Sequence, residues 1–255
     1  VNEEDHLRMQ SIKAGLSLSE AFKMIDKVDS KIEVGLDYAF DNKYGYLTAC
    51  PTNLGTGMRA SSMLHLPGLV LSDQINKVIQ AVNKIGLAVR GLYGEGTEAL
   101  GNLFQVSNQH TLGESEEEII ARLEKVIKQI IEHEENAREK LYDEDKTTLN
   151  DKIGRSYAIL RYAHIISTKE ALDLLSMLRL GVDLRYFSDD LRSLIDVLFM
   201  EIQPAHLQVY ANRKLNVEER DCLRAEIMRD RLKNLPEPSK FFDNSSNELP
   251  STEDQ

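Results

Sequence analysis

Residues 50–61 form the segment best suited to chemistry and read CPTNLGTGMRAS. A turn that contains glycines lets backbone amides approach an anion closely. Arg59, near the end of the segment, supplies a guanidinium that can donate two hydrogen bonds to a phosphate. Cys50 lies at the end of a predicted strand and has polar neighbours that can stabilise a thiolate. Alone, however, a cysteine and a glycine-rich turn more often form a buried side chain and an ordinary strand connection.

Two further polar segments contain residues of the same kinds. Residues 2–8 read NEEDHLR and residues 90–98 read RGLYGEGTE, so each combines carboxylates with an arginine. Taken alone, the first fits a solvated acidic turn and the second a flexible loop. These two segments indicate a function only in combination with the first segment.

A third arrangement lies near the C-terminus, where residues 220–225 read RDCLRA. On a helix, Arg220 and Arg224 are four residues apart and share a face. Two guanidinium groups on one face are a plausible anion clamp. By spacing alone, a solvated surface helix with neighbouring glutamates as ion-pair partners is the commoner structure.

The composition excludes several classes of protein. The 255 residues are 29% charged and 42% hydrophobic, which is typical of a globular protein. No apolar run approaches the roughly 20 residues that span a bilayer, so no membrane partner is expected. A net charge of −11 argues against direct nucleic-acid binding and suits a basic partner or substrate. Cys50 and Cys222 form neither a disulfide framework nor a metal-ligand pattern, so the cytoplasm is the expected location.

Hydrophobic spacing predicts strands and helices first and helices alone afterwards. A helix is expected over residues 17–34, and a long amphipathic helix from Ser115 to about Leu141 has Ile119, Leu123, Ile127 and Ile130 on one face. Between them, the pattern predicts strands at 44–50, 63–71, 87–94 and 103–109, and a helix that begins at Ser72.

The chain is expected to divide near residue 145. Beyond it, capping boxes are expected at Ser167–Glu170 and Asn216–Glu219, and Gly181 is expected to end the first of these helices. The tail is rich in proline, serine, asparagine and acidic residues, a composition typical of disorder. The predicted domains are a catalytic domain at 1–145, a helical domain at 146–235 and a disordered tail at 236–255.

Together, these segments resemble the phosphagen (guanidino) kinases, the family of creatine kinase and arginine kinase. That family carries a Cys-Pro-Ser/Thr-Asn-Leu-Gly-Thr run that ends in Arg-Ala, an acidic motif upstream and an Arg-Gly…Gly-Glu…Thr-Glu loop downstream. Residues 106–109 (VSNQ) match as well. The resemblance covers about residues 1–140. It implies an α+β fold with a mainly antiparallel sheet flanked by helices, and a helical C-terminal domain would follow.

The resemblance also implies a role for each matching residue. Glu4 would bind the guanidinium of the substrate and act as base, Glu95 would hold its other side, and Cys50 would align one of its nitrogens. ATP would be the phosphate donor, and Mg²⁺ would bridge its phosphates with no metal ligand assigned in the protein. The implied ATP-binding residues are Arg8, Arg59, Ala60, Ser61, Ser62, Met63, Arg90, Gly91, Leu92, Tyr93, Gly94 and Glu95.

Acid–base chemistry supports this division of roles. A free arginine guanidinium has a pKa of about 12.5–13.8, so removal of its proton at pH 7 would cost roughly 8 kcal/mol. Proton removal should therefore accompany the attack of nitrogen on phosphorus. Two carboxylates that flank the planar group fix its orientation, while arginines and Mg²⁺ neutralise the phosphate charge.

The helical region resembles the C-terminal domain of the bacterial protein arginine kinases (the McsB type). The segments DKIGRSY at 151–157, RLGVDL at 179–184 and SNQHTLG at 107–113 carry that resemblance. Phosphagen kinases usually have a histidine where this chain has Met63 and Gly96, and both differences agree with this branch. The RDxxRA motif of that branch implies an allosteric phosphoarginine site at Arg220, Asp221, Arg224 and Ala225.

This second resemblance implies phosphorylation of exposed arginines in proteins as part of a stress response. Phosphoarginine would mark proteins, a heat-shock repressor among them, for Clp-type proteolysis. A Clp ATPase and a zinc-containing activator protein are the implied partners, and a homodimer is consistent with it. The chain begins at Val1 with an acidic cluster, whereas the family places further phosphate-binding arginines upstream, so we expect a fragment that lacks its N-terminal part.

Two alternatives stay open. The first is a phosphagen-type kinase for free arginine or another small guanidino compound, against which the helical domain and its RDxxRA motif count. The second is a truncated, inactive module that binds phosphoarginine proteins. An upstream truncation allows this reading even though the expected catalytic residues of this region are intact.

Overall fold

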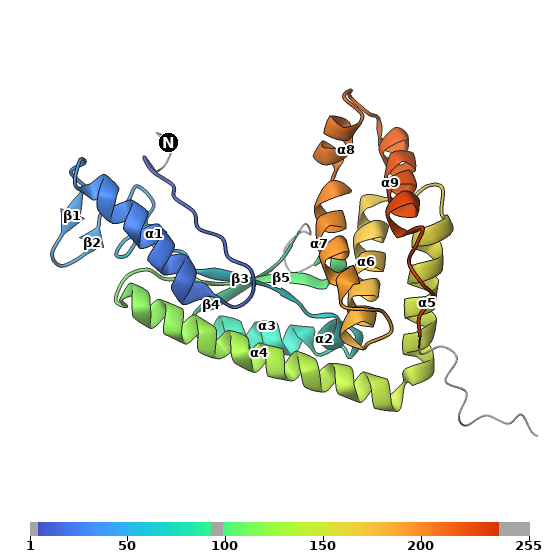
Figure 1. Cartoon of the computed structure of the whole chain (residues 1–255). Coiled ribbons are helices and arrows are strands. Elements are labelled where there is room, and N and C mark those ends of the chain that lie inside the picture. The colour runs from blue at the N-terminus through green and yellow to red at the C-terminus, as the bar shows by residue number, and fades with distance from the viewer. Residues whose placement is uncertain (1–4, 93–98, 240–255) are drawn as a thin grey trace, which may run out of the picture. The chain divides into compact units, whose positions relative to one another are not determined.

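The computed structural model describes residues 5–92 and 99–239 (Figure 1). The chain forms two compact units that divide between Lys140 and Leu141. The long helix α4 (Glu116–Glu144) passes through this point. Among the predicted site residues, Glu4, Tyr93, Gly94 and Glu95 lie outside the described residues.

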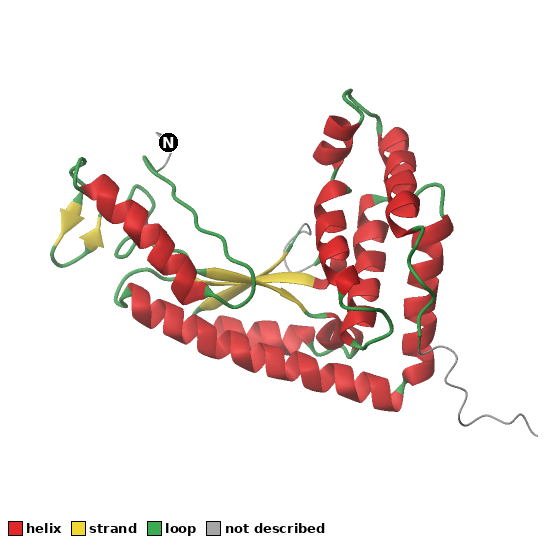
Figure 2. Cartoon of the chain, viewed as in Figure 1, coloured by secondary structure: helices red, strands yellow, loops and turns green. Residues whose placement is uncertain are grey.

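The first unit combines a small antiparallel sheet with helices, as Figure 2 shows by colour. Its strands are β1 (Phe40–Asp41), β2 (Gly45–Tyr46), β3 (Ser61–His65), β4 (Leu87–Gly91) and β5 (Leu103–Asn108). β5 pairs with β3 on one side and β4 on the other, and β1 pairs with β2 in a separate hairpin. The other elements are α1 (Leu18–Glu33), the 3-10 turns η1 (Pro51–Asn53) and η2 (Leu100–Asn102), α2 (Pro67–Leu71) and α3 (Ile75–Lys84).

One face of the three-stranded sheet is apolar and forms the core of this unit. Val89, Phe104 and Val106 are at most 8% exposed and belong to one cluster with Leu123 and Ile127 of α4. α3 and α4 run along the same side of the sheet in Figure 1. Because neighbouring side chains of a strand alternate between faces, the intervening residues point to the opposite face. The α+β prediction for this part of the chain is confirmed.

The predicted strand at 63–71 is wrong in its second half. β3 ends at His65, and α2 begins at Pro67. Proline has no N–H to donate to a strand ladder, whereas its fixed φ suits the first position of a helix. Ser72 consequently follows α2 instead of opening α3, which begins at Ile75. The predicted strand at 44–50 is also shorter, because only Gly45–Tyr46 pairs.

The described residues of the second unit form helices and the loops between them. They are α5 (Lys146–Tyr162), α6 (Thr168–Asp183), α7 (Asp190–Glu201), α8 (Pro204–Tyr210) and α9 (Val217–Leu232). Asn216 and Glu219 form the reciprocal capping box predicted for α9, and the Ser167 hydroxyl accepts from the Glu170 amide at α6. No helix of the described residues is long and apolar enough to cross a membrane.

One prediction about this unit needs correction. Gly181 does not end its helix, because α6 continues to Asp183. A Cβ at this position would lie 2.8 Å from the ring of Phe187, so close helix packing explains the glycine. Past residue 235, Pro238 is buried, and the Ser239 amide donates to the carbonyl of Tyr186 at 3.0 Å.

A buried arginine ties α9 to the rest of the second unit. The side chain of Arg224 is 0% exposed and lies on the buried stripe of α9 with Met228 and Leu232. Its Nε donates to the carbonyl of Ile202, and its Nη1 donates to the carbonyl of Ile166 at 2.7 Å. It also pairs with Asp221 at 2.5 Å and donates to the hydroxyl of Thr168 at 2.8 Å. A buried charge is costly unless it is paired and hydrogen-bonded, and these bonds meet that requirement.

We expect Arg224→Ala to destabilise the second unit by about 3–5 kcal/mol, because it leaves a carboxylate and two carbonyls without their donor. Urea unfolding followed by far-ultraviolet circular dichroism would measure this loss. Arg231→Ala is the matched control on the same helix, since Arg231 is 47% exposed and pairs with Glu201 at the surface. The control should lose less than about 1 kcal/mol. Equal losses would contradict a structural role for Arg224.

Candidate active site

Cys50 lies at the start of the loop that joins β2 to β3. It precedes the 3-10 turn η1, in which Pro51 occupies the first position. Its Sγ atom is 2.9 Å from the hydroxyl of Thr52, and its carbonyl accepts a bond from the hydroxyl of Thr48 at 2.7 Å. Cys50 is half-buried, so its thiol is held in a polar setting but stays accessible.

Thr111, which follows β5, fastens this loop from the other side. Its hydroxyl donates to the carbonyls of Thr52 at 3.0 Å and Leu54 at 2.7 Å. Its own carbonyl accepts from the amide of Thr56 at 2.9 Å. Between these contacts Gly55 has a φ of +108°, and a Cβ there would lie only 2.2 Å from the carbonyl oxygen of Thr111. Only glycine allows the two segments to approach so closely.

Asn108 holds the end of the loop where Arg59 lies. Asn108 is 3% exposed. Its Nδ2 donates to the carbonyls of Met58 and His110, both at 3.0 Å, and its Oδ1 accepts from the amide of Ala60 at 2.9 Å. The backbone on both sides of Arg59 is therefore fixed. The Arg59 guanidinium reaches the hydroxyl of Ser107 at 3.3 Å.

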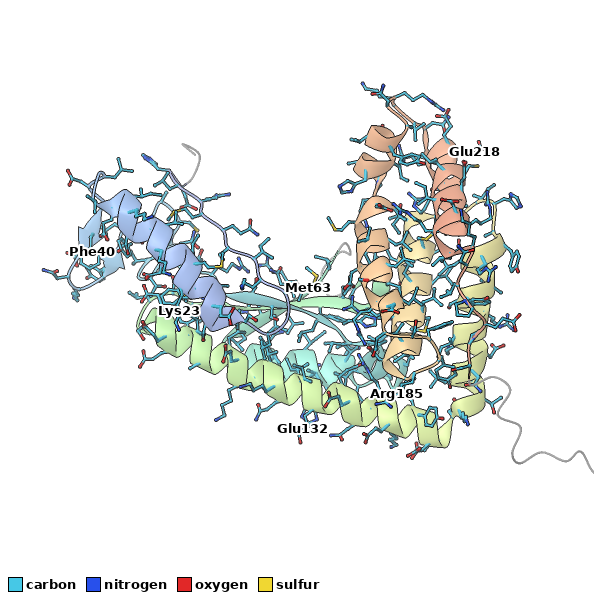
Figure 3. The ribbon with its side chains drawn as sticks, viewed as in Figure 1. Lys23, Phe40, Met63, Glu132, Arg185 and Glu218 are labelled. Carbon is cyan, nitrogen blue, oxygen red and sulfur yellow. The ribbon has the colours of Figure 1, made fainter. Side chains whose placement is uncertain are left out.

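The strand register brings the other predicted phosphate-binding residues onto one face of the sheet. Met63 and Arg90 both lie opposite Gln105, so the three side chains form a row across β3, β5 and β4. Ser61 and Ser107 form the next pair on the same face, and Gln105 Nε2 donates to the hydroxyl of Ser61 at 2.9 Å. Met63 is 54% exposed and points away from α4 in Figure 3. This face, which we call the polar sheet face, is opposite the core.

The structure places the remaining predicted residues as follows. Ser62 alternates with Ser61 and Met63, so it faces the core side of β3. Gly91 ends β4, and the amide of Leu92 donates to the carbonyl of Leu103 at 2.8 Å. Arg8 lies on the N-terminal segment and pairs with Asp5 at 3.2 Å. The structure thus joins the stretches 59–63 and 90–92 through β5.

Sequence reasoning missed the groups that hold this site in place. The matching stretches contain Thr111 and Asn108 without assigning them a role, and they do not include Gln105. Their importance comes from contacts with residues more than 40 positions away, which no local pattern reveals.

Of the two arginines in the predicted clamp on α9, one is half-buried and the other is fully buried. Arg220 is half-buried, and its Nη1 donates to the carbonyl of Leu215 at 2.8 Å. Arg224 and Ala225 are fully buried, and Asp221 is occupied by Arg224. A ligand in solution can reach Arg220, but it can reach Arg224 only if that side chain leaves its partners.

The polar sheet face is suited to binding a polyphosphate. Arg59 and Arg90 supply guanidinium groups, and Ser61, Gln105 and Ser107 supply neutral donors between them. Within residues 5–92 and 99–239, no group of three or more histidine, cysteine or acidic side chains is placed to hold a metal ion.

Comparison with known proteins assigns both parts of the chain. Residues 1–137 match the family model described as "ATP:guanido phosphotransferase, C-terminal catalytic domain". Residues 146–242 match the model described as "Protein-arginine kinase McsB C-terminal domain".

Individual relatives agree with these family matches. A protein-arginine kinase of Geobacillus sp. (strain WCH70) is 52% identical over 91% of this chain and 64% of its own length. A protein-arginine kinase of Caldanaerobacter subterraneus is 53% identical over 91% of this chain and 68% of its own length. The chain thus spans about two thirds of the length of these curated relatives. Among solved structures, a lombricine kinase is 31% identical over 46% of this chain and 32% of its own, with a TM-score of 0.40.

We expect Gly55→Ala to lower the free energy of unfolding by about 1–3 kcal/mol more than Gly113→Ala does, because the added methyl group overlaps the Thr111 carbonyl. Gly113 is the matched control, since its φ is +93° and no atom lies within 4 Å of a Cβ there. Both changes carry a similar backbone strain, so the difference isolates the overlap. Chemical denaturation of the two variants would measure it, and equal losses would mean that the loop can move away from Thr111.

Proposed function

Because this chain belongs to the ATP:guanido phosphotransferase family, we propose that it carries the catalytic part of a protein arginine kinase. The observation that carries the proposal is the polar sheet face, where Arg59 and Arg90 flank a row of neutral donors. The names of the relatives at 52–53% identity, and the match of residues 146–242, favour arginine in proteins as the acceptor.

The proposed reaction transfers the γ-phosphoryl group of ATP to a guanidinium nitrogen. A nitrogen–phosphorus bond forms, the bond from the γ-phosphorus to the β,γ-bridging oxygen breaks, and ADP leaves. The proton from the attacking nitrogen passes to the carboxylate of Glu4. Glu95 and Cys50 orient the guanidinium, so that the attacking nitrogen lies in line with the leaving oxygen.

The residues of this chain act mainly by holding charges in place. Arg59 and Arg90, with Arg8 from the N-terminal segment, offset the charge that develops on the phosphate oxygens. Bound Mg²⁺ would add to this charge neutralisation. Asn108 fixes the backbone on both sides of Arg59, which reduces the reorganisation that the transition state requires.

The proposal includes a regulatory and cellular part that the family suggests. Phosphoarginine would mark target proteins in the cytoplasm, a heat-shock repressor among them, for a Clp ATPase. A zinc-containing activator protein and a second copy of the chain are the other proposed partners. The best alternative is transfer to free arginine or another small guanidino compound, and a phosphoarginine-binding module without activity is the second.

A phosphotransfer assay with labelled ATP tests the function directly. The protein should be extended upstream to its natural start, and free arginine and an arginine-rich protein should be offered as separate acceptors. We expect an acid-labile phosphorus–nitrogen product on the protein and none on free arginine. Label on free arginine would support the small-substrate alternative, and no label on either acceptor, even with an activator, would support the binding module.

Glu4→Gln should reduce this transfer by about 100-fold or more, because the amide cannot accept the proton. Glu3→Gln makes the same change one residue earlier and should retain activity. A Glu4→Gln enzyme with full activity would refute the proposed mechanism.

We also propose that the RDCLRA segment binds phosphoarginine through Arg220, with Arg224 acting as the buried support of α9. Arg220→Ala should weaken binding by about ten- to a hundredfold, which corresponds to the loss of one charge-assisted bond of roughly 1.5–3 kcal/mol. Titration calorimetry with phosphoarginine would measure the change. Arg213→Ala is the control, since Arg213 is an exposed arginine near the start of α9 that pairs with Glu219. Equal binding by wild type and Arg220→Ala would exclude this site.

A further inference from the structure

A corner of the first unit lies where the polar sheet face meets α2. β3 ends at His65, the chain turns at Leu66, and α2 begins at Pro67. The first amides of a helix have no partner within the helix. Because proline has no N–H, the first free amides here belong to Gly68 and Leu69. Both residues are buried, so these amides need a partner from elsewhere in the protein.

The carboxylate of Glu134 is that partner. Its Oε1 accepts from the amide of Gly68 at 2.8 Å, and its Oε2 accepts from the amide of Leu69 at 2.9 Å. Glu134 lies on α4 and is 3% exposed. Burial raises the pKa of Glu134, while the nearby charge of Arg138 and the two amides oppose the increase.

Arg138 connects this carboxylate to the end of β3. Its Nε pairs with Glu134 Oε1 at 2.5 Å, and its Nη2 donates to the carbonyl of His65 at 3.2 Å. Gly68 packs directly on the pair, because a Cβ there would lie 2.9 Å from Cγ of Arg138 and 3.0 Å from Oε1 of Glu134. The corner therefore has little room to move relative to α4.

The same corner is also connected to the predicted site residues at the end of β4. The amide of Leu66 donates to the carbonyl of Asn102 at 2.9 Å. Asn102 ends η2, and the amide of Leu100 donates to the carbonyl of Leu92 at 3.2 Å. Leu92 comes directly after β4, whose last two residues are Arg90 and Gly91. Two stretches that line the polar sheet face, one ending in Met63 and one beginning at Arg90, are thus joined at one point.

We propose that Glu134 and Arg138 are positioning residues of the phosphotransfer site, which fix the relative placement of β3 and the segment after β4. This inference rests on the proposed function, because it assigns the two residues a role in that same site. They act through the carbonyl of His65 and the amides of Gly68 and Leu69.

Steady-state kinetics of Glu134→Gln and Arg138→Lys in the protein extended to its natural start would test this role. We expect kcat/KM for ATP to fall about tenfold or more at temperatures where both variants are fully folded, because misplacement of reacting groups by about 1 Å can cost roughly 100-fold. Gly68→Ala disturbs the same corner without a change of charge and should show the same loss. It also keeps the test valid if one of the charge variants does not fold.

Arg122→Lys is the matched control. Arg122 also lies on α4, pairs with Glu114 at 2.5 Å and donates to a backbone carbonyl, that of Ile85, at 3.0 Å. We expect its kcat and KM to stay within about twofold of wild type, even if its melting temperature falls as much as that of Arg138→Lys.

The outcomes separate this proposal from the proposed function. The positioning role would be overturned if the wild type is active and the three variants lose stability but keep its kcat and KM. These variants are Glu134→Gln, Arg138→Lys and Gly68→Ala, and that result would limit the pair to helix capping. Equal kinetic losses in Arg122→Lys would also overturn it. A wild-type protein that transfers no phosphate would overturn the proposed function, and with it this inference.

Discussion

β5 forms hydrogen bonds with β3 on one side and with β4 on the other, and this double pairing decides which side chains face the same way. In the observed register, Met63, Gln105 and Arg90 share one face, while Phe104 and Val106 face the core. A slip of one residue would exchange the two faces. The burial of the apolar set therefore specifies the candidate site, because a register that exposed the core would also bury the proposed phosphate-binding side chains.

Each unit contains a charged side chain at a helix position that the apolar pattern would assign to the core. Glu134 continues the buried stripe of α4 after Ile127 and Ile130, and Arg224 does so on α9. Both satisfy backbone groups of another segment, namely the amides at the start of α2 and the carbonyls of Ile166 and Ile202. A buried charge is tolerated only with such partners, so the two side chains link segments that apolar contacts alone would not place as specifically.

The sequence predicts the fold well where one period dominates, as in α4, β4 and β5. It predicts poorly between 63 and 71, where an apolar run fits a buried strand and a buried helix equally and Pro67 decides between them. The sequence points to Arg59 and Arg90 as candidate site residues because each lies in a motif that matches the family. Thr111 and Arg138 are not predictable, since each acts on residues more than 50 positions away. Glu134 did leave a signal, because it occupies the position four residues after Ile130 on an apolar face.

The RDCLRA segment shows why spacing on a helix cannot tell which arginine meets a ligand. A separation of four residues rotates the side chain by about 40° around the helix axis. At the border between core and surface, that rotation separates Arg224, which is fully buried, from Arg220, which is half-buried. Asp221 pairs with Arg224 through its side chain, and its carbonyl accepts from the amide of Ile166. Under the proposal that Arg220 binds phosphoarginine, the ligand would bind next in sequence to Asp221, whose bonds hold it to Arg224 and to the start of α6.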